Sequence, residues 1–229
     1  MFATVADVRN RPGADIPIGI EEKKMTLLTK EEIVQGLELK YREDVQQFPT
    51  YFNGVIPKAA TKDQEREISA EIFNISGIKA PDSFREMLRE WDLGDLKLLN
   101  FRFGNGGSFS SALRKMNTAP DGLNWWGDRA AMDRPNGLLM VAQGDPDIVL
   151  LDVTSGEILT FIADLGSSTA KTVAPSISQF FRGLGSISLM NPSIDDVEGF
   201  TASLANAVGI NINRSFWRIL VDQWKDFAE

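Results

Sequence analysis

Three short apolar segments, separated by turn residues, limit the folds open to this chain more than any other feature. They are Gly137–Val141, Ile148–Asp152 and Glu157–Ala163. The sequence QGDPD at 143–147 separates the first two, and Ser155-Gly156 lies before the third. Gly, Asp, Pro and Ser favour tight turns, and the third segment alternates in polarity as a strand does. The pattern predicts three consecutive strands, and therefore a sheet that other parts of the chain must cover.

Helices are predicted before these strands. Residues 29–32 (TKEE) form a capping box, in which a Thr side chain caps the helix and a Glu side chain reaches back to it. Apolar residues at helical spacing extend this helix to about Gln47, before Pro49. A second capping box at 61–64 (TKDQ) predicts a helix that ends at Gly77.

The next elements alternate between helix and strand signals. Pro81-Asp82 precedes a third predicted helix, and the segment LKLLNFRF, which ends at Gly104, predicts one strand. Ser108 is placed to cap a short helix that continues to about Met116. After the three strands, residues 175–179 (PSISQ) contain a further cap, followed by an apolar helical face.

These patterns divide the chain into three parts. Residues 1–28 are rich in Pro, Gly and charge without periodicity, and predict an N-terminal arm. Residues 29–185 predict one α+β domain. Residues 186–229 predict a helical C-terminal extension packed on that domain, with one helix that begins at Asn191-Pro192-Ser193 and a last helix from Arg214 to Phe227.

The composition restricts the chemistry. The chain has no Cys and no His, which excludes thiolate nucleophiles, Ser-His-Asp arrangements and imidazole metal ligands. An enzyme would need carboxylates, Lys, Tyr or an oxygen-bound cation. A general acid at Glu71 would need a second carboxylate nearby, and none lies at an identifiable spacing in the sequence. A structural role on its helix is therefore favoured. We therefore expect a protein that is not an enzyme.

Cofactor and metal signals are incomplete. Residues 104–108 (GNGGS) precede a predicted helix but lack the Lys-Ser/Thr of a phosphate loop and the spacing of a dinucleotide fingerprint. Asp145, Asp147 and Asp152 are too few and too widely spaced for a calcium loop, and turn chemistry explains the first two. The sequence therefore predicts no cofactor and no metal.

The charge indicates the kind of partner. The net charge is −8 and the sequence pI is about 4.8, so the surface repels nucleic acid and anionic membranes and suits a basic protein. Solubility alone is the other explanation of such a surface. No apolar segment approaches the length of a membrane span, and the N-terminal residues lack a signal-peptide pattern. We expect a cytoplasmic protein with no nucleic-acid or membrane partner.

Five residues are candidates for partner binding. Trp125, Trp126 and Asp128 lie in a polar segment that contains Gly, and Asp145 and Asp147 lie in a predicted turn. Tryptophan is enriched in interface hot spots. Burial of both rings over the edge of the core is the favoured alternative, because buried aromatic residues are more common than hot spots. The two turn carboxylates would add acidic charge to a partner surface.

In the order of its elements, the chain resembles the SUKH superfamily over residues 29–185. The superfamily pattern begins with a helix that carries an Ala-Glu pair, a break that contains Gly, and a Pro before a helix with an aromatic residue. A Gly-Asp hairpin, an apolar strand that ends in Asp, a Ser-Gly turn and a final helix follow. The matching positions are Ala70-Glu71, Gly77, Pro81, Phe84, Gly144-Asp145, Leu150–Asp152, Thr154–Gly156 and Ala174–Leu184.

The resemblance implies an α+β fold in which a bent, mostly antiparallel sheet is flanked by helices. Bacterial members of this superfamily are mostly immunity proteins, so it also implies binding and occlusion of a cognate secreted or contact-delivered toxin, such as a nuclease or deaminase. A non-catalytic scaffold or regulatory binding module with the same fold is the alternative, and a carboxylate-dependent enzyme ranks last. The oligomeric state stays open.

Overall fold

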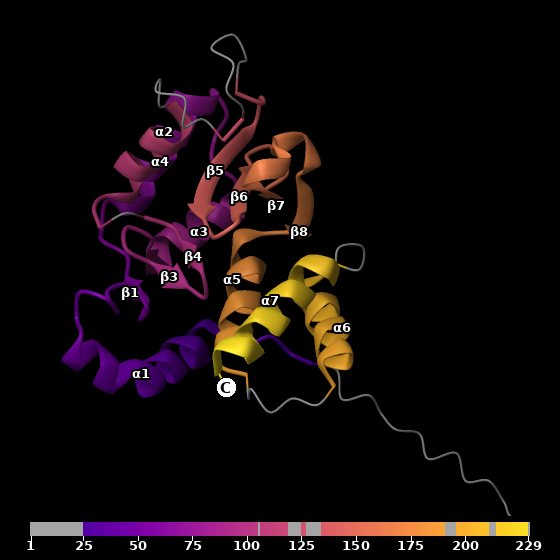
Figure 1. Cartoon of the computed structure of the whole chain (residues 1–229). Coiled ribbons are helices and arrows are strands. Elements are labelled where there is room, and N and C mark those ends of the chain that lie inside the picture. Colours follow the sequence, from indigo (N-terminus) through magenta and orange to yellow (C-terminus); the bar gives the residue numbers. More distant parts are fainter. Residues whose placement is uncertain are drawn as a thin grey trace, which may run out of the picture.

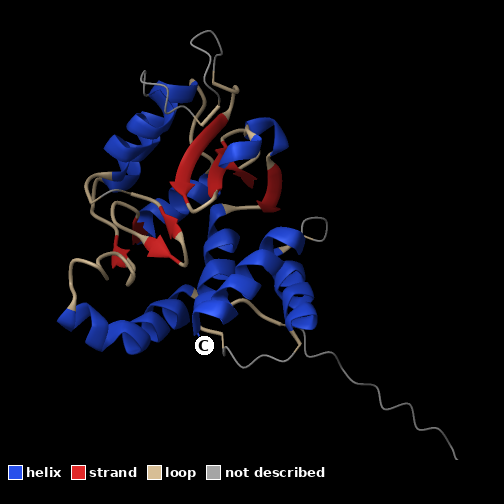
Figure 2. Ribbon diagram, in the orientation of Figure 1, coloured by secondary structure: helices blue, strands red, loops and turns tan. Residues whose placement is uncertain are grey.

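The computed structural model describes residues 25–104, 106–118, 125–126, 134–190, 196–210 and 214–228. In this part of the chain, helices flank a curled antiparallel sheet that forms a half-barrel (Figures 1 and 2), which confirms the predicted α+β class. The helices are α1 (Lys30–Gln47), α2 (Gln64–Ser76), α3 (Asp82–Glu90), α4 (Phe109–Thr118), α5 (Ile177–Ser188), α6 (Val197–Val208) and α7 (Arg214–Ala228). Within these ranges, no helix combines the length and the apolar character needed to cross a bilayer.

The main sheet has six strands, and each strand pairs with its neighbour in chain order and in antiparallel orientation. The three central strands are those that the sequence predicts. The strands are β3 (Lys97–Leu98), β4 (Phe101–Arg102), β5 (Leu138–Gln143), β6 (Asp147–Asp152), β7 (Ile158–Ile162) and β8 (Lys171–Ala174). A separate pair consists of β1 (Lys58–Ala59) and β2 (Trp91–Asp92).

The prediction of one strand over LKLLNFRF is wrong, because this segment folds as the tight hairpin β3–β4. Leu99 at its turn has a φ of 53°, and Leu98 pairs with Phe101. In a continuous strand, residues three apart face opposite sides of the sheet. The turn instead brings the side chains of Leu98 and Phe101 into the same core, where they are 2% and 0% exposed.

The first helix confirms its predicted cap, and the second begins differently. In α1, Thr29 and Glu32 form both hydrogen bonds of the capping box. In α2, Gly77 ends the helix with a φ of 72°, as predicted, but the predicted capping box at 61–64 is wrong because the helix begins at Gln64. The Gln64 side chain is buried, and its Nε2 donates to the backbone carbonyl groups of Leu88 and Trp91 instead.

The predicted helices on either side of the sheet are present. Ser108 accepts a hydrogen bond from the Ser111 N–H at the start of α4, and Ser176 accepts one from the Gln179 N–H at the start of α5. Two short 3₁₀ helices, Ala163–Leu165 and Ser167–Thr169, connect β7 with β8. These caps were predictable because a Ser just before a helix accepts a hydrogen bond from an N–H group that has no partner within the helix.

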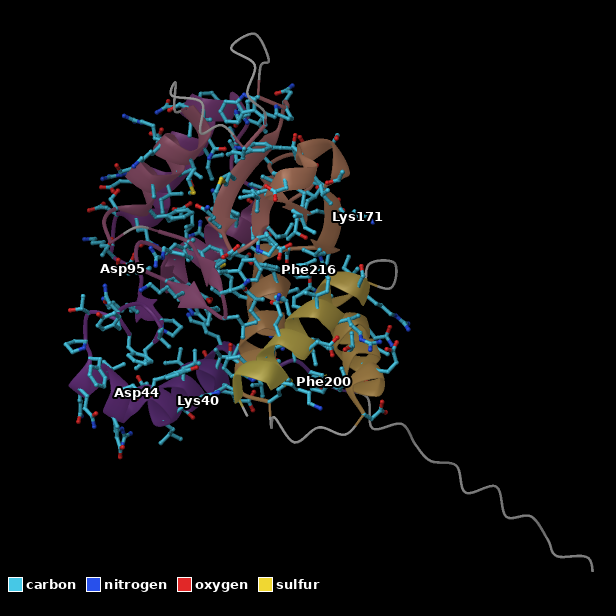
Figure 3. The ribbon with its side chains drawn as sticks, in the orientation of Figure 1. Lys40, Asp44, Asp95, Lys171, Phe200 and Phe216 are labelled. Carbon is cyan, nitrogen blue, oxygen red and sulfur yellow. The ribbon has the colours of Figure 1, made fainter. Side chains whose placement is uncertain are left out.

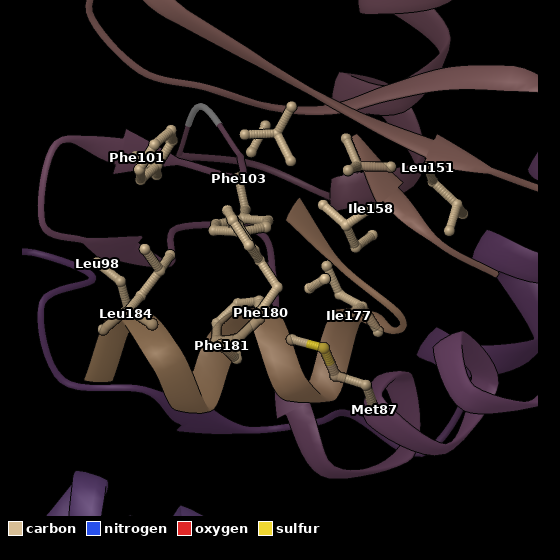
Figure 4. Packing of buried hydrophobic residues seen from close by; sticks show 14 of the residues in the cluster. Met87, Leu98, Phe101, Phe103, Leu151, Ile158, Ile177, Phe180, Phe181 and Leu184 are labelled. Carbon is tan, nitrogen blue, oxygen red and sulfur yellow. The ribbon is translucent and has the colours of Figure 1, made fainter. Parts of the chain in front are cut away.

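The main core lies between α5 and one face of the sheet (Figure 4). The ring centroids of Phe103 and Phe181 are 4.6 Å apart, and those of Phe101 and Phe180 are 5.8 Å apart. Apolar residues of the central strands complete this cluster, together with Met87 of α3. The helix and the sheet therefore hold each other in place through aromatic packing.

The two C-terminal helices share this core. In α7, the predicted last helix, Trp217 is fully buried and its Nε1 donates to the Val173 carbonyl of β8 over 3.0 Å. The predicted start at Asn191-Pro192-Ser193 is wrong for this helix, because α6 begins at Val197 with the non-helical Asp196 as its cap. Residues 191–193 themselves lie outside the described residues. Residues 1–24 of the predicted arm also lie outside them. The carbonyl groups of Leu27 and Leu28 accept hydrogen bonds from Arg182 of α5.

Candidate interaction surface

Trp125 belongs to a second apolar cluster, on the other face of the sheet. Its side chain is 9% exposed and packs with Met140, Ile148, Leu150 and Phe161. Trp125 therefore takes the buried role that the sequence offered as the alternative to a partner anchor.

The amide of Asn117 in α4 holds this cluster in place. The Trp125 Nε1 and the Met140 N–H both donate to Asn117 Oδ1, over 3.2 and 2.8 Å. Asn117 Nδ2 donates in turn to the Leu113 and Met140 carbonyl groups. All these bonds lie in the interior, where an unpaired polar group is costly.

Trp126 lies beside Trp125 and is half-buried. The two ring centroids are 5.4 Å apart, and the rings meet edge to face. Trp126 packs against the same cluster, so both rings contact this face of the sheet. Asp128, the third candidate of this segment, lies outside the described residues.

Asp145 lies in the turn between β5 and β6, as predicted, and Asp147 follows as the first residue of β6. The Gly144 N–H donates to the Asp147 carbonyl over 2.7 Å, and Asn100 Nδ2 donates to the Asp145 carbonyl over 3.1 Å. A Cβ at Gly144 would lie 2.8 Å from the Phe101 ring, so only Gly fits there. Asp145 is exposed and Asp147 is half-buried, and this burial raises the pKa of Asp147.

The structure adds three exposed residues beside this turn. Asp147 pairs with Ile162 across the strands, and the Ala163 N–H donates to the Pro146 carbonyl over 3.1 Å. Ile162 and Leu165 are 37% and 61% exposed, and Asp164 lies between them. We call this set the turn surface; its members are Asp145, Pro146, Asp147, Ile162, Asp164 and Leu165.

The apolar part of the turn surface was not predicted. Ile162 falls inside the third predicted strand, and no role was predicted for Leu165. The available signal was the sequence Ile-Ala-Asp-Leu-Gly, in which two large apolar residues flank a carboxylate near a strand end. Carboxylates around exposed apolar side chains match a partner with basic residues around an apolar recess.

The third carboxylate of the considered cation cluster does not join the other two. Asp152 lies at the opposite end of β6, where its Oδ1 accepts hydrogen bonds from the N–H groups of Thr154 and Ser155. Across the ranges that the structure describes, no group of three or more acidic side chains is arranged to hold a metal ion. Turn chemistry accounts for Asp152.

Glu71 is engaged in a structural ion pair. Its side chain is 6% exposed, and its two oxygens accept hydrogen bonds from Arg114 Nε (2.8 Å) and Nη2 (2.5 Å). These hydrogen bonds lower the pKa of Glu71. A carboxylate held ionised in this way joins α2 to α4 and is a poor general acid.

A small pocket of about 100 Å³ lies between the start of α1, α3 and α5. Its charged lining includes Lys30, Glu90 and Arg182. The Lys30 ammonium lies 3.0 Å from a Glu90 oxygen and 5.7 Å from the centre of the Trp91 ring, while the Arg182 guanidinium is bonded to the backbone of Leu27 and Leu28. The cations of this pocket are therefore engaged in contacts within the protein.

No family model, curated protein or solved structure matches this chain.

Proposed function

We propose that this protein is an immunity protein that binds and occludes a cognate secreted or contact-delivered bacterial toxin, such as a nuclease or deaminase. The turn surface carries the proposal, because its three carboxylates border exposed Ile162 and Leu165 on a well-packed sheet. The α+β fold, with its curled sheet and flanking helices, supports the proposal because it is the fold class that the SUKH resemblance implies. A cytoplasmic location, where such a toxin would act, belongs to the same proposal.

The physical basis of the proposed activity is occlusion and not chemical conversion. A nucleic-acid-processing toxin needs a basic cleft for phosphate groups, and carboxylates placed on a rigid turn oppose such a cleft with matching charge. Ile162 and Leu165 would lose water on contact and supply hydrophobic free energy, at about 25 cal/mol per Å² of buried apolar surface. Bound in this way, the protein would block the substrate path of the toxin.

A binding experiment tests the proposal. The full chain is titrated with a catalytically inactive form of the toxin encoded beside its gene. We expect the variant Asp145→Asn/Asp147→Asn to bind at least about tenfold more weakly, because it loses two interfacial charges. Glu67→Gln, an exposed carboxylate on α2, is the matched control and should bind as the unmodified chain does.

The same experiment separates the proposal from a scaffold or regulatory module. A module of that kind would show several weak partners and no tight complex with a neighbouring toxin. The proposal is wrong if no toxin from the gene neighbourhood binds the full chain. It is also wrong if cells that produce Asp145→Asn/Asp147→Asn survive the toxin as well as cells that produce the unmodified chain.

A further inference from the structure

The C-terminal half of α1 has little packing of its own. Within this helix only Ile33 and Leu37 are buried, and no residue from Glu38 to Gln47 is. Figure 1 shows this half extending away from α5, the helix on which α1 packs. Most helices in proteins depend on a packed apolar face for their stability. In this half only partly buried residues such as Tyr41 contact the core, so most of its surface is available to a partner.

Aromatic side chains gather at this end. Phe48 and Tyr51 are 52% and 81% exposed, in a turn where the Tyr51 and Phe52 N–H groups both donate to the Phe48 carbonyl. The half-buried Phe52 and Tyr41 rings lie 5.9 Å apart and support this turn from α1. We call Tyr41, Phe48, Tyr51 and Phe52 the α1-end surface. Exposed aromatic residues on a supported turn are the side chains most often used as interface anchors.

The charges beside this surface are mainly negative. The last three turns of α1 carry Glu38, Glu43 and Asp44 against the cations Lys40 and Arg42. The Lys40 ammonium is already engaged, because it donates to the Ser188 carbonyl over 2.9 Å and lies 4.1 Å from the centre of the Trp224 ring. Figure 3 shows Lys40 and Asp44 on α1. Lys40 keeps its charge in these contacts, so three carboxylates are balanced against two cations and the segment has a small net negative charge.

From this combination we infer that the α1-end surface docks a basic protein surface. Tyr51 and Phe48 enter an apolar recess of the partner, and partner Lys or Arg side chains pair with Glu43 and Asp44. This surface is formed by α1 and the turn after it. The turn surface is formed by the β5–β6 turn, the start of β6, the end of β7 and the 3₁₀ helix that follows. The inference is independent of the proposed immunity function.

A photo-crosslinking amino acid at position 51 of the full chain tests the inference in cells that naturally produce it. The same amino acid at Lys171, an exposed residue of β8, is the control. We expect position 51, and not position 171, to capture one basic protein. That protein is then purified and titrated, and its binding should weaken as salt rises, because opposite charges are screened.

Side-chain variants complete the test. Phe48→Ala/Tyr51→Ala should weaken binding of the captured protein by at least about tenfold, the loss typical of interface anchors. Ile219→Ala, at a 48% exposed apolar residue of α7, should leave it unchanged. Circular dichroism checks that each variant folds.

The inference is overturned if position 51 captures nothing, only a second copy of this chain, or a neutral or acidic protein. An equal loss of binding in Phe48→Ala/Tyr51→Ala and in Ile219→Ala also overturns it. If the captured protein binds Phe48→Ala/Tyr51→Ala normally, the inference alone is overturned. The immunity function is tested separately, at the turn surface.

Discussion

At the scale of single residues, Asn117 shows how one buried polar side chain holds a tryptophan ring against a sheet. Its amide joins α4, Trp125 and β5 through four hydrogen bonds. Replacing it with Leu would leave the Trp125 and Met140 N–H groups without partners. We expect Asn117→Leu to lower the free energy of unfolding by about 2–4 kcal/mol.

Urea unfolding followed by tryptophan fluorescence measures this loss. Ser111→Ala, an exposed change on the same helix, should stay within about 0.5 kcal/mol of the unmodified protein. An Asn117→Leu variant with an unchanged midpoint would show that Asn117 does not hold Trp125 in place.

Glu71 gives a prediction of pH dependence. Hydrogen bonds from Arg114 lower the pKa of Glu71 in the folded protein, so the unfolded chain takes up the proton first as the pH falls. The stability that this carboxylate supplies is therefore complete above its unfolded pKa of about 4.3 and is lost as the pH falls through the lower folded pKa. In chemical denaturation, the stability difference between the unmodified chain and Glu71→Gln should be largest near neutral pH and shrink in acid. A difference that is constant with pH contradicts this account.

At the scale of elements, local patterns predicted most helices and the central strands but not the edges of the sheet. Thr29, Gly77 and Ser176 act through neighbours within four residues, so their caps could be read from the sequence. The β3–β4 hairpin could not, because its turn depends on the burial of Phe101 against α5. Strand β8 was missed because its four residues have no clear alternation.

Helix α7 reaches the edge strand β8 through the buried side chain of Trp217, and this leads to an element-scale prediction. Trp217→Ala removes a fully buried ring and the donor to the Val173 carbonyl. We expect a loss of about 3–5 kcal/mol in unfolding free energy and an increased tendency to associate, because an uncovered strand edge can pair with another chain. Thermal unfolding and light scattering measure both, with Ile219→Ala on the same helix as the control. An unchanged melting temperature would mean that α7 does not stabilise the sheet.

At the scale of the whole molecule, the candidate surface could be predicted only in part. Asp145 and Asp147 lie in the predicted turn, because Gly, Asp and Pro determine that turn locally. Ile162 and Leu165 lie beside them because β6 pairs with β7 and a 3₁₀ helix follows β7. A local sequence pattern shows neither the register of that pairing nor the exposure of the two side chains. The net charge of −8 indicated a basic partner, but not the surface that would meet it.

The rate of association with the neighbouring toxin tests the central claim most directly. If the protein works by presenting an acidic surface to a basic one, raising the salt concentration from about 0.05 to 0.5 M should slow association by about tenfold or more. Asp145→Asn/Asp147→Asn should show a slower rate and a weaker dependence on salt, while Glu67→Gln keeps both. A rate that does not change with salt, and is the same in the double variant, would contradict the account.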